Sequence, residues 1–355
     1  GDDTRAMNRP SVNGESAAFM VMNRNKRGIA LNLKLPPARD ALKRMAAQVD
    51  VLTENYRKGT MEKLGLGYEA LKAVNPALIY CSISGYGRTG PYADKGGFDL
   101  VAQGVSGLMA ITGEPGRPPV KSGNPICDIN GGILAALGIV SAYVHRLKSG
   151  EGQLVDTSLY EAGIQQTYWQ SAIFFATGQS PGPIGSSHLL SAPYQAFRAR
   201  DGWLTIGGAN QPNWERLARV LDAPEWLADE RFRTNSDRMK NLDALVPLVN
   251  AKLEQRTVRE WIERLEAEGV PCGPINSVGE MLGDPQTKAR DMVVELEHPK
   301  AGGTRALGLP IKLSATPGAI RRPAPTYGQH TREVLAEFGF TSGEIEALVA
   351  SGAAA

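Results

Sequence analysis

Short apolar segments alternate with helical ones between residues 51 and 156, and this order constrains the fold most. Val51 to Glu54, Leu78 to Ile83 and Leu154 to Asp156 have the length and composition of strands. A short helix is predicted around Tyr68 to Val74, between the first two strands. Strands that alternate with helices form a parallel sheet, because a crossover helix returns the chain to the same edge. The sequence therefore predicts a doubly wound α/β domain.

A long apolar helix that begins near Asp128 precedes the third strand. Apolar residues recur at a three-four spacing and predict one buried stripe, which comprises Ile133, Leu137, Val140, Val144 and Leu147. Asp is a favoured N-cap residue, and the positive end of the helix dipole keeps a carboxylate there ionised. The nearby Gly131 and Gly132 cost about 1 kcal/mol each relative to Ala and leave space at the backbone. Asp128 is thus either a structural cap or a nucleophile, and we retain it as the candidate catalytic residue.

Further elements follow from local patterns on either side of this unit. Gly28 to Lys34 alternates as a half-buried strand does, and helices are predicted at Ala38 to Val49 and Phe98 to Ile111. Tyr194 to Phe197 and Trp203 to Ile206 predict a hairpin. Four later helices are predicted at Trp214 to Leu221, Leu242 to Leu253, Val258 to Glu268 and Thr331 to Phe338.

The chain of 355 residues is longer than one hydrophobic core usually serves. We expect a large α/β domain over residues 1–177 and a linker over 178–193, where Gly, Pro and Ser concentrate. A smaller α+β domain follows over 194–284, then a proline-rich return linker over 285–325. The helical part over 326–355 is expected to return to the large domain.

Composition excludes several classes of partner. The net charge of +2 with scattered Lys and Arg argues against nucleic acid or an anionic membrane as partner. Three cysteines and four dispersed histidines lack metal-ligand spacing, so neither a metal site nor a disulfide framework is expected. We find no apolar run of membrane-spanning length. The chain opens Gly-Asp-Asp-Thr-Arg without a leader, as a fragment or processed product does, and we expect a cytoplasmic protein, or a mitochondrial one if the source is eukaryotic.

Two familiar motifs do not hold up in their context. Gly85-Tyr-Gly-Arg-Thr-Gly90 matches the dinucleotide fingerprint, but an irregular loop follows where a helix should open, so NAD binding is rejected. The turn is better explained as a ligand loop. Ser106 lacks the spacing of a nucleophile elbow, so serine hydrolase chemistry is not supported.

Gly207 and Gly208 follow a predicted strand. They form either a simple turn or a mobile loop over a site.

Several phrases of the chain resemble the family III CoA-transferases, also called the CaiB/BaiF family, over essentially its whole length. They are Asn23-Arg-Asn-Lys-Arg-Gly-Ile-Ala-Leu-Asn-Leu-Lys34; Glu54-Asn-Tyr-Arg57 with Met61-Glu-Lys-Leu-Gly-Leu-Gly67; Gly85-Tyr-Gly-Arg-Thr-Gly-Pro-Tyr92; Gly150-Glu-Gly-Gln153; Gly269-Val-Pro-Cys-Gly-Pro-Ile-Asn276; and Gly328-Gln-His-Thr331. The family's nucleophilic aspartate falls on Asp128.

The resemblance implies a Rossmann-like large domain, an interlocked homodimer, and acyl-CoA and a small carboxylic acid as substrates, with no tightly bound cofactor. The resemblance also implies an opening strand and helix in relatives, which we expect to be missing from this chain. The implied active-site loops hold Gly131, Gly132, Gly207 and Gly208. The positions implied to bind CoA are Leu31, Asn32, Leu33, Lys34, Asn55, Tyr56, Arg57, Lys63, Gly96, Gly97, Phe98 and Asp99. Lys34, Arg57 and Lys63 suit phosphate groups, and Tyr56 suits adenine.

The implied mechanism is covalent catalysis by Asp128, through an aspartyl anhydride and an aspartyl-CoA thioester. A competing activity on the same fold is racemisation of a 2-methylacyl-CoA by a paired histidine and aspartate. Racemases carry a Gly-His-Asp phrase, whereas this chain has Gly97-Phe98-Asp99 and Phe98 cannot exchange a proton. A CoA-binding protein without catalysis is the third hypothesis. The sequence does not name the two acids exchanged.

Overall fold

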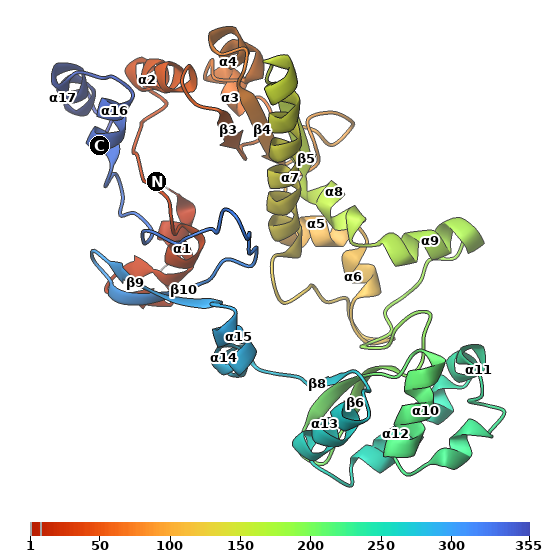
Figure 1. Cartoon of the computed structure of the whole chain (residues 1–355). Helices are drawn as coiled ribbons and strands as arrows, with labels where there is room; N and C mark the ends of the chain where they lie inside the picture. The colour runs from red at the N-terminus through yellow and green to blue at the C-terminus, as the bar shows by residue number, and fades with distance from the viewer. Residues whose placement is uncertain (1, 8) are drawn as a thin grey trace. The chain divides into compact units, whose positions relative to one another are not determined.

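The computed structural model describes residues 2–7 and 9–355. They form two compact units that each combine separate stretches of chain (Figure 1). The first unit comprises residues 1–102, 126–162 and 278–355, and the second comprises residues 103–125 and 163–277. This division differs from the expected boundaries, because residues 103–125 and the expected linker over 178–193 belong to the second unit.

A parallel three-stranded sheet forms the centre of the first unit, as predicted. Its order is β3 (Val51–Glu54), β4 (Ile79–Ser84) and β5 (Leu154–Ser158), with β4 in the middle. β4 begins with three residues that are fully buried, Ile79, Tyr80 and Cys81, as a strand covered on both faces requires. The helices α3 (Thr60–Lys63) and α4 (Tyr68–Val74) carry the chain from β3 to β4. Ligand sites of such sheets lie where the strands end, here after Glu54, Ser84 and Ser158.

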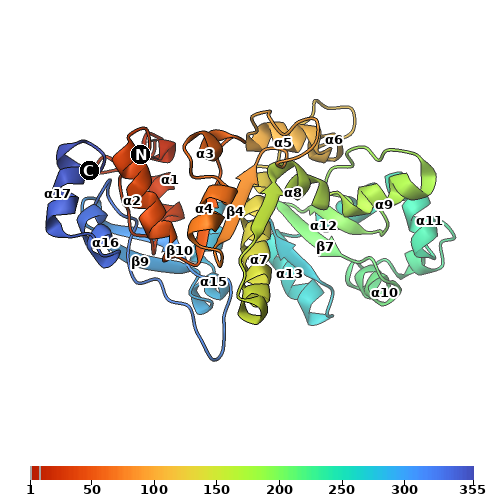
Figure 2. The same ribbon diagram turned by 90° about the horizontal axis from the view of Figure 1, so that it is seen from above.

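The long helix α7 (Ile126–Ser149) packs against β4 and β5 through small residues (Figure 2). Gly131, Ala135 and Ala142 are buried there, and a Cβ on Gly138 would meet Val155 Cγ1 at 2.7 Å. The prediction of a buried large-residue stripe is therefore wrong for the single chain. Its members face outward, and Ile133, Leu137, Val140 and Leu147 are 59, 63, 59 and 70% exposed. The helical spacing of the apolar residues was predicted correctly. The face that packs on the sheet, however, is the one with small residues, because they allow the helix and the sheet to approach closely.

By length and composition alone, α7 could cross a bilayer, since it has 24 residues and contains an 18-residue stretch with a mean hydropathy of 1.5. The prediction that no run of this length exists is thus wrong. In the folded chain α7 is instead a partly buried core helix on the sheet.

Two elements that precede α7 in the chain differ from the prediction. The single helix expected at 98–111 is divided into α5 (Asp99–Val105) and α6 (Leu108–Ile111), because Gly107 between them has a φ of +88°. The strand expected at Gly28 to Lys34 does not form. Its one ladder contact is an isolated bridge between Leu31 and Ala354 near the C-terminus.

Both ends of the chain lie in the first unit. The helix α2 (Pro36–Ala46) shares a hydrophobic core with α16 (Thr331–Glu337) and α17 (Ser342–Ala350). The short strands β1 (Ser11–Val12) and β2 (Glu15–Ser16) precede α1 (Ala17–Met22).

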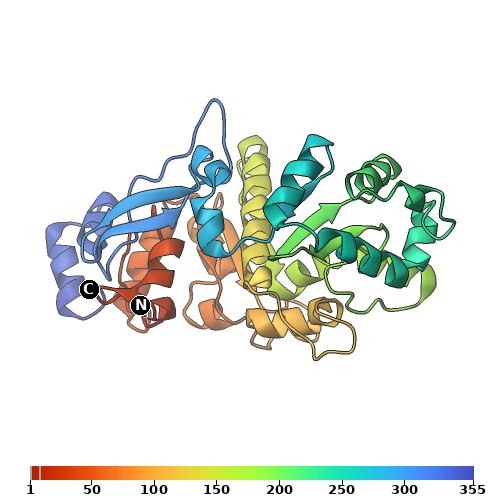
Figure 3. The ribbon, with the colours of Figure 1, turned by 90° about the horizontal axis from the view of Figure 1, so that it is seen from below.

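The stretch expected to be a return linker contains regular structure. The helices α14 (Val278–Gly283) and α15 (Pro285–Ala289) lead into an antiparallel hairpin of β9 (Val293–His298) and β10 (Gly302–Leu307). β10 packs on α1 (Figure 3). The later prolines concealed this hairpin in the sequence.

The second unit is built on the antiparallel sheet β6 (Tyr194–Arg198), β7 (Trp203–Gly207) and β8 (Cys272–Pro274), and it confirms the predicted hairpin. Its helices include α8 (Leu159–Gln165, shared with the first unit), α9 (Tyr168–Thr177), α10 (Gln211–Val220), η2 (Pro224–Leu227), α11 (Asn235–Lys240), α12 (Leu242–Leu253) and α13 (Val258–Ala267). Trp214, Phe197 and Trp261 anchor one continuous core.

Candidate active site

A pocket of about 90 Å³ lies at the carboxyl ends of β3 and β4, and we call it the strand-end pocket. Two of the predicted CoA segments line it, residues 55–57 after β3 and residues 96–98 before α5. Close backbone contact holds the loops together, because a Cβ on Gly97 would lie 2.5 Å from the Cα of Gly85. The glycine-rich turn at Gly85 thus serves backbone packing beside the pocket.

A second pocket of about 440 Å³ shares Tyr56 with the first one, and we call it the cationic pocket. The predicted Leu31 lines it, together with Arg5, Lys26 and Arg27. No role was predicted for these three cations from the sequence, although Lys26 and Arg27 lie in the basic segment Asn23 to Lys34. Arg27 pairs with Glu333 at 2.8 Å and with Glu337 at 2.6 Å, so its charge is already balanced. Lys26 is hydrogen-bonded to the neutral Asn23 and forms no direct ion pair among the described residues. Its charge and that of Arg5 help to lower the pKa of Asp2, which lines the same pocket. Lys26 is therefore a candidate cation for phosphate.

Other predicted CoA residues are not gathered in these pockets. Lys34 and Lys63 are exposed, and neither of them lines the strand-end pocket or the cationic pocket. Asn32 accepts a hydrogen bond from the backbone of Lys34 at 3.2 Å and so shapes a turn. Leu33 packs among the apolar residues around α2.

A charged cluster that was not predicted from the sequence fixes the loop after β3. Glu54 is 7% exposed and accepts the backbone N–H of Tyr56 at 2.7 Å. The guanidinium of Arg88 lies 3.7 Å from Glu54, donates to Ser82 at 3.3 Å and pairs with Glu62. Burial opposes the charge on Arg88, but the hydrogen bond to Glu62 and the two carboxylates raise its pKa overall. We call Glu54, Glu62 and Arg88 the arginine clamp.

Asp128 is the third residue of α7, inside its first turn rather than at its cap. The cap is Asp99, whose Oδ1 accepts the backbone N–H groups of Cys127 at 2.9 Å and of Asp128 at 3.4 Å. No group in the described part of the chain, residues 2–7 and 9–355, donates a hydrogen bond to the Asp128 carboxylate. The structural cap that the sequence left open for Asp128 is therefore provided by Asp99.

The electrostatics of Asp128 differ from the expectation based on the helix dipole alone. Loss of hydration against neighbouring protein atoms raises the pKa of its carboxyl, and the nearby charge of Asp99 raises it further. Both effects act in the direction opposite to the helix dipole, which by itself would lower the pKa. A carboxylate with a raised pKa and no hydrogen bond is more basic and more nucleophilic than an ordinary surface aspartate.

The glycines expected in active-site loops have separate roles. Gly131 and Gly132 lie within α7 itself, so the description of them as a loop is wrong. A Cβ on Gly131 would meet Leu159 at 3.2 Å, whereas Gly132 faces open space. Gly207 ends β7, and Gly208 is buried against Pro193 and Leu217.

The residue that would be histidine in a racemase is exposed. Phe98 has 76% of its surface accessible and lines the strand-end pocket. Across residues 2–7 and 9–355, no group of three or more His, Cys, Asp and Glu side chains is placed to hold a metal ion.

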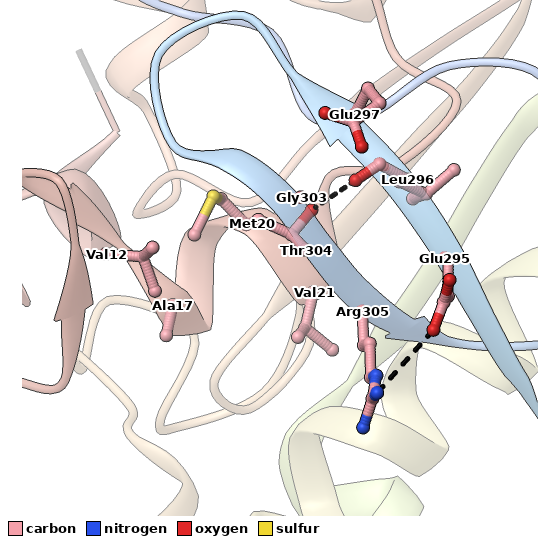
Figure 4. A pocket seen from close by; sticks show the side chains of 10 residues that line it. All are labelled: Val12, Ala17, Met20, Val21, Glu295, Leu296, Glu297, Gly303, Thr304 and Arg305. Atoms are coloured by element: carbon pink, nitrogen blue, oxygen red, sulfur yellow. Dashed lines mark hydrogen bonds and ion pairs between the residues drawn. The ribbon is translucent and has the colours of Figure 1, made fainter.

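A further pocket of about 570 Å³ lies between α1 and the hairpin β9–β10 (Figure 4). Its apolar wall comes from Val12, Met20 and Val21, and its charged rim includes Glu295 and Arg305, which pair at 3.5 Å. Glu297 lines the same pocket, but none of the residues predicted from the sequence to act in catalysis or to bind CoA does.

Comparisons with known proteins agree with the resemblance seen in the sequence. The profile of "CoA-transferase family III" matches residues 1–331. A succinyl-CoA:glutarate CoA-transferase from Mus musculus is 36% identical over 99% of this chain and 81% of its own length. An acetyl-CoA:oxalate CoA-transferase from Acetobacter aceti is 37% identical over 95% of this chain and 86% of its own. A crystal structure of a CaiB/BaiF family protein from Brucella suis superposes with a TM-score of 0.84 at 37% identity, over 95% of this chain and 89% of that one. With this agreement in sequence and in fold, the chain belongs to the CoA-transferase family III and is an enzyme of that family.

Proposed function

We propose that this enzyme moves CoA from an acyl-CoA donor such as succinyl-CoA to a small dicarboxylic acid, with Asp128 as nucleophile. One observation carries the proposal: Asp99 caps α7 and leaves the Asp128 carboxylate without a hydrogen bond from the described residues. Two similar proteins, a succinyl-CoA:glutarate and an acetyl-CoA:oxalate CoA-transferase, support dicarboxylates as the acid class.

The reaction then proceeds in four exchanges at one carboxylate. Asp128 attacks the thioester carbonyl, the CoA thiolate leaves, and a mixed anhydride forms. The thiolate attacks the aspartyl carbonyl, which releases the donor acid and leaves an aspartyl-CoA thioester. The acceptor carboxylate attacks this thioester, so that a second anhydride forms and the thiolate leaves again. The thiolate finally attacks the acceptor's acyl carbon, which yields the new acyl-CoA and regenerates Asp128.

Surrounding residues support these steps. The first turn of α7 presents its positive end to the oxyanions that form at Asp128, and Gly132 leaves open space beside it. CoA is placed by the strand-end and cationic pockets, where Tyr56 offers a face for adenine and Lys26 and Arg57 offer cations for phosphate.

We further infer that the exposed stripe on α7 is covered by a second copy of the chain. Ile133, Leu137, Val140 and Leu147 form a continuous apolar face that a lone soluble chain rarely exposes. Leu137→Glu should reduce the mass measured by light scattering at micromolar concentration from that of a dimer to that of a single chain. Val74→Glu, at an exposed apolar residue of α4, serves as the matched control and should stay dimeric. A wild-type protein of single-chain mass would refute this part of the proposal.

The chemistry is tested by trapping the intermediate. After incubation with succinyl-CoA, hydroxylamine should convert the aspartyl thioester to a hydroxamate, which mass spectrometry would find on the peptide that contains Asp128. A panel of free acids added in place of hydroxylamine should yield new thioesters, and dicarboxylates should react best. Deuterium exchange at C2 of a 2-methylacyl-CoA without any adduct on Asp128 would favour the racemase instead.

A further inference from the structure

One wall of the cationic pocket is a continuous segment, residues 26–31, which lies outside every helix and strand of the described chain. A segment without regular structure keeps one shape only if its backbone groups find partners elsewhere. The opposite wall includes Pro325 and Gly328, which lie about 300 residues later in the sequence. Gly328 also begins the phrase Gly328-Gln-His-Thr331, which leads into α16.

Three alternate N–H groups of the first wall donate to acceptors from the C-terminal part of the chain. They are those of Gly28 to His330 Nδ1 at 3.1 Å, of Ala30 to Thr331 Oγ1 at 3.0 Å, and of Asn32 to Ala353 O at 2.9 Å. The backbone N–H of His330 in turn donates to Gly28 O at 2.9 Å. Because alternate N–H groups of an extended chain point the same way, the side chains of His330 and Thr331 take the place of a neighbouring strand.

These contacts are enclosed and closely fitted. Thr331 is 2% exposed and Ala30 is 7% exposed, so an N–H at Ala30 that lost its acceptor would find no ready substitute in water. A Cβ on Gly28 would lie 3.0 Å from Pro325 of the opposite wall. The hydrogen bonds and this close approach together fix the distance between the two walls.

We propose that His330 and Thr331 are positioning residues for CoA. They fix the backbone at Gly28 and Ala30, and thereby the place at which Lys26 and Leu31 face the bound nucleotide. Neither His330 nor Thr331 lines the pocket, so both act through the segment and not on the substrate. The inference rests on the proposed function, which places CoA in this pocket. Loss of either acceptor should weaken CoA binding and leave the chemistry at Asp128 unchanged.

The test uses the full chain, with CoA as the probe in isothermal titration calorimetry. Thr331→Val keeps the shape of the side chain but removes the acceptor of the Ala30 N–H, so CoA affinity should fall by at least about fivefold. Thr331→Ser keeps a hydroxyl and should restore CoA affinity to within about twofold of wild type. With saturating succinyl-CoA and the best acceptor acid, kcat of both variants should stay within about twofold of wild type, since only binding is lost.

Hydrogen exchange provides a readout that does not depend on CoA. The Ala30 N–H should exchange faster in Thr331→Val than in Thr331→Ser, because the segment opens more often. His330→Ala removes the acceptor of the Gly28 N–H and should also lower CoA affinity. Arg332→Gln is the matched control at the next residue of α16, where only an exposed ion pair with Glu346 is lost, and it should bind CoA as wild type does.

The outcomes separate this inference from the proposed function. If wild type binds CoA and Thr331→Val binds it as tightly as Thr331→Ser, the inference is overturned and the proposed function stands. Faster exchange at Ala30 without any loss of CoA affinity would show that Thr331 is merely structural, and it too overturns the inference. A wild-type chain that binds no CoA would remove both.

Discussion

The arginine clamp and the first turn of α7 both place charges at the carboxyl edge of the parallel sheet, but they arrange them oppositely. In the clamp, Arg88 lies between Glu54 and Glu62, so unlike charges neutralise one another. At α7, Asp99 and Asp128 are like charges, and only Asp99 accepts the helix N–H groups. The clamp is thus a scaffold that holds the loop at Tyr56, and the α7 turn keeps one carboxylate available for chemistry.

The largest expected effect comes from removing the available carboxylate. Asp128→Asn should lower CoA transfer by at least about 10³-fold, since an amide cannot form the anhydride. It should also unfold at a higher temperature than wild type at pH 7. The raised pKa of Asp128 means that its ionised form is disfavoured in the folded chain, so removal of the charge is favourable there.

The gain in stability should shrink as the pH falls below the pKa of Asp128, because wild type then becomes neutral at this position too. Thermal melts of both proteins from pH 7 to pH 3 measure this. Near-normal CoA transfer by Asp128→Asn would show that Asp128 is not the nucleophile.

Breaking the clamp should affect stability more than chemistry. Arg88→Gln leaves Glu54, which is 7% exposed, without its cation, and we expect a loss of about 2–3 kcal/mol in unfolding free energy. The Michaelis constant for acyl-CoA should rise more than kcat falls, because the loop at Tyr56 is loosened. Urea titration and steady-state kinetics measure the two effects.

Arg305→Gln is the matched control for the clamp, since Arg305 pairs with Glu295 where both side chains are more than three-quarters exposed. Its cost should be below about 0.5 kcal/mol. An equal loss in both variants would show that the clamp is no more than an ordinary surface pair.

The two roles of Asp99 are separable by a pair of substitutions. Asp99→Ala removes the cap and should cost about 1 kcal/mol of unfolding free energy, whereas Asp99→Asn keeps a cap of similar strength. In Asp99→Asn the neighbouring negative charge is gone, so the pKa of Asp128 should fall and the acid limb of the pH–rate profile should move to lower pH. An unmoved acid limb would mean that Asp99 does not influence the nucleophile.

The smallest effect is expected from the exposed member of the clamp. Burial alone would raise the pKa of Glu62, but hydrogen bonds from its own backbone and from Arg88 lower it overall. A carboxylate whose pKa is lower in the folded state than in the unfolded state stabilises the fold at pH values above its unfolded-state pKa. This stabilisation is lost as the pH falls through the folded-state pKa. Glu62→Gln should therefore be slightly less stable than wild type at pH 7 and equally stable near pH 3, as melts at both pH values would show.

Much of the fold was predictable from local sequence. The strands at residues 51, 79 and 154 and the hairpin at 194–207 were located correctly, because apolar period and turn residues act over a few positions. The position of Asp128 at the start of a long helix was likewise visible. The strand at 28–34 failed because its alternating residues meet no neighbouring strand beyond the bridge to Ala354.

Sequence by itself determined the three strands of the parallel sheet, the hairpin β6–β7 and the presence of Asp128 at the start of the core helix. Only the tertiary structure decided that Asp99, 29 residues before Asp128, caps that helix, that small residues of α7 face the sheet, and that Arg88 lies between two carboxylates. The physical reason is range. Helix and strand periods are set by neighbouring residues, whereas capping from a distant loop, burial and charge pairing depend on segments that meet only after the chain has folded.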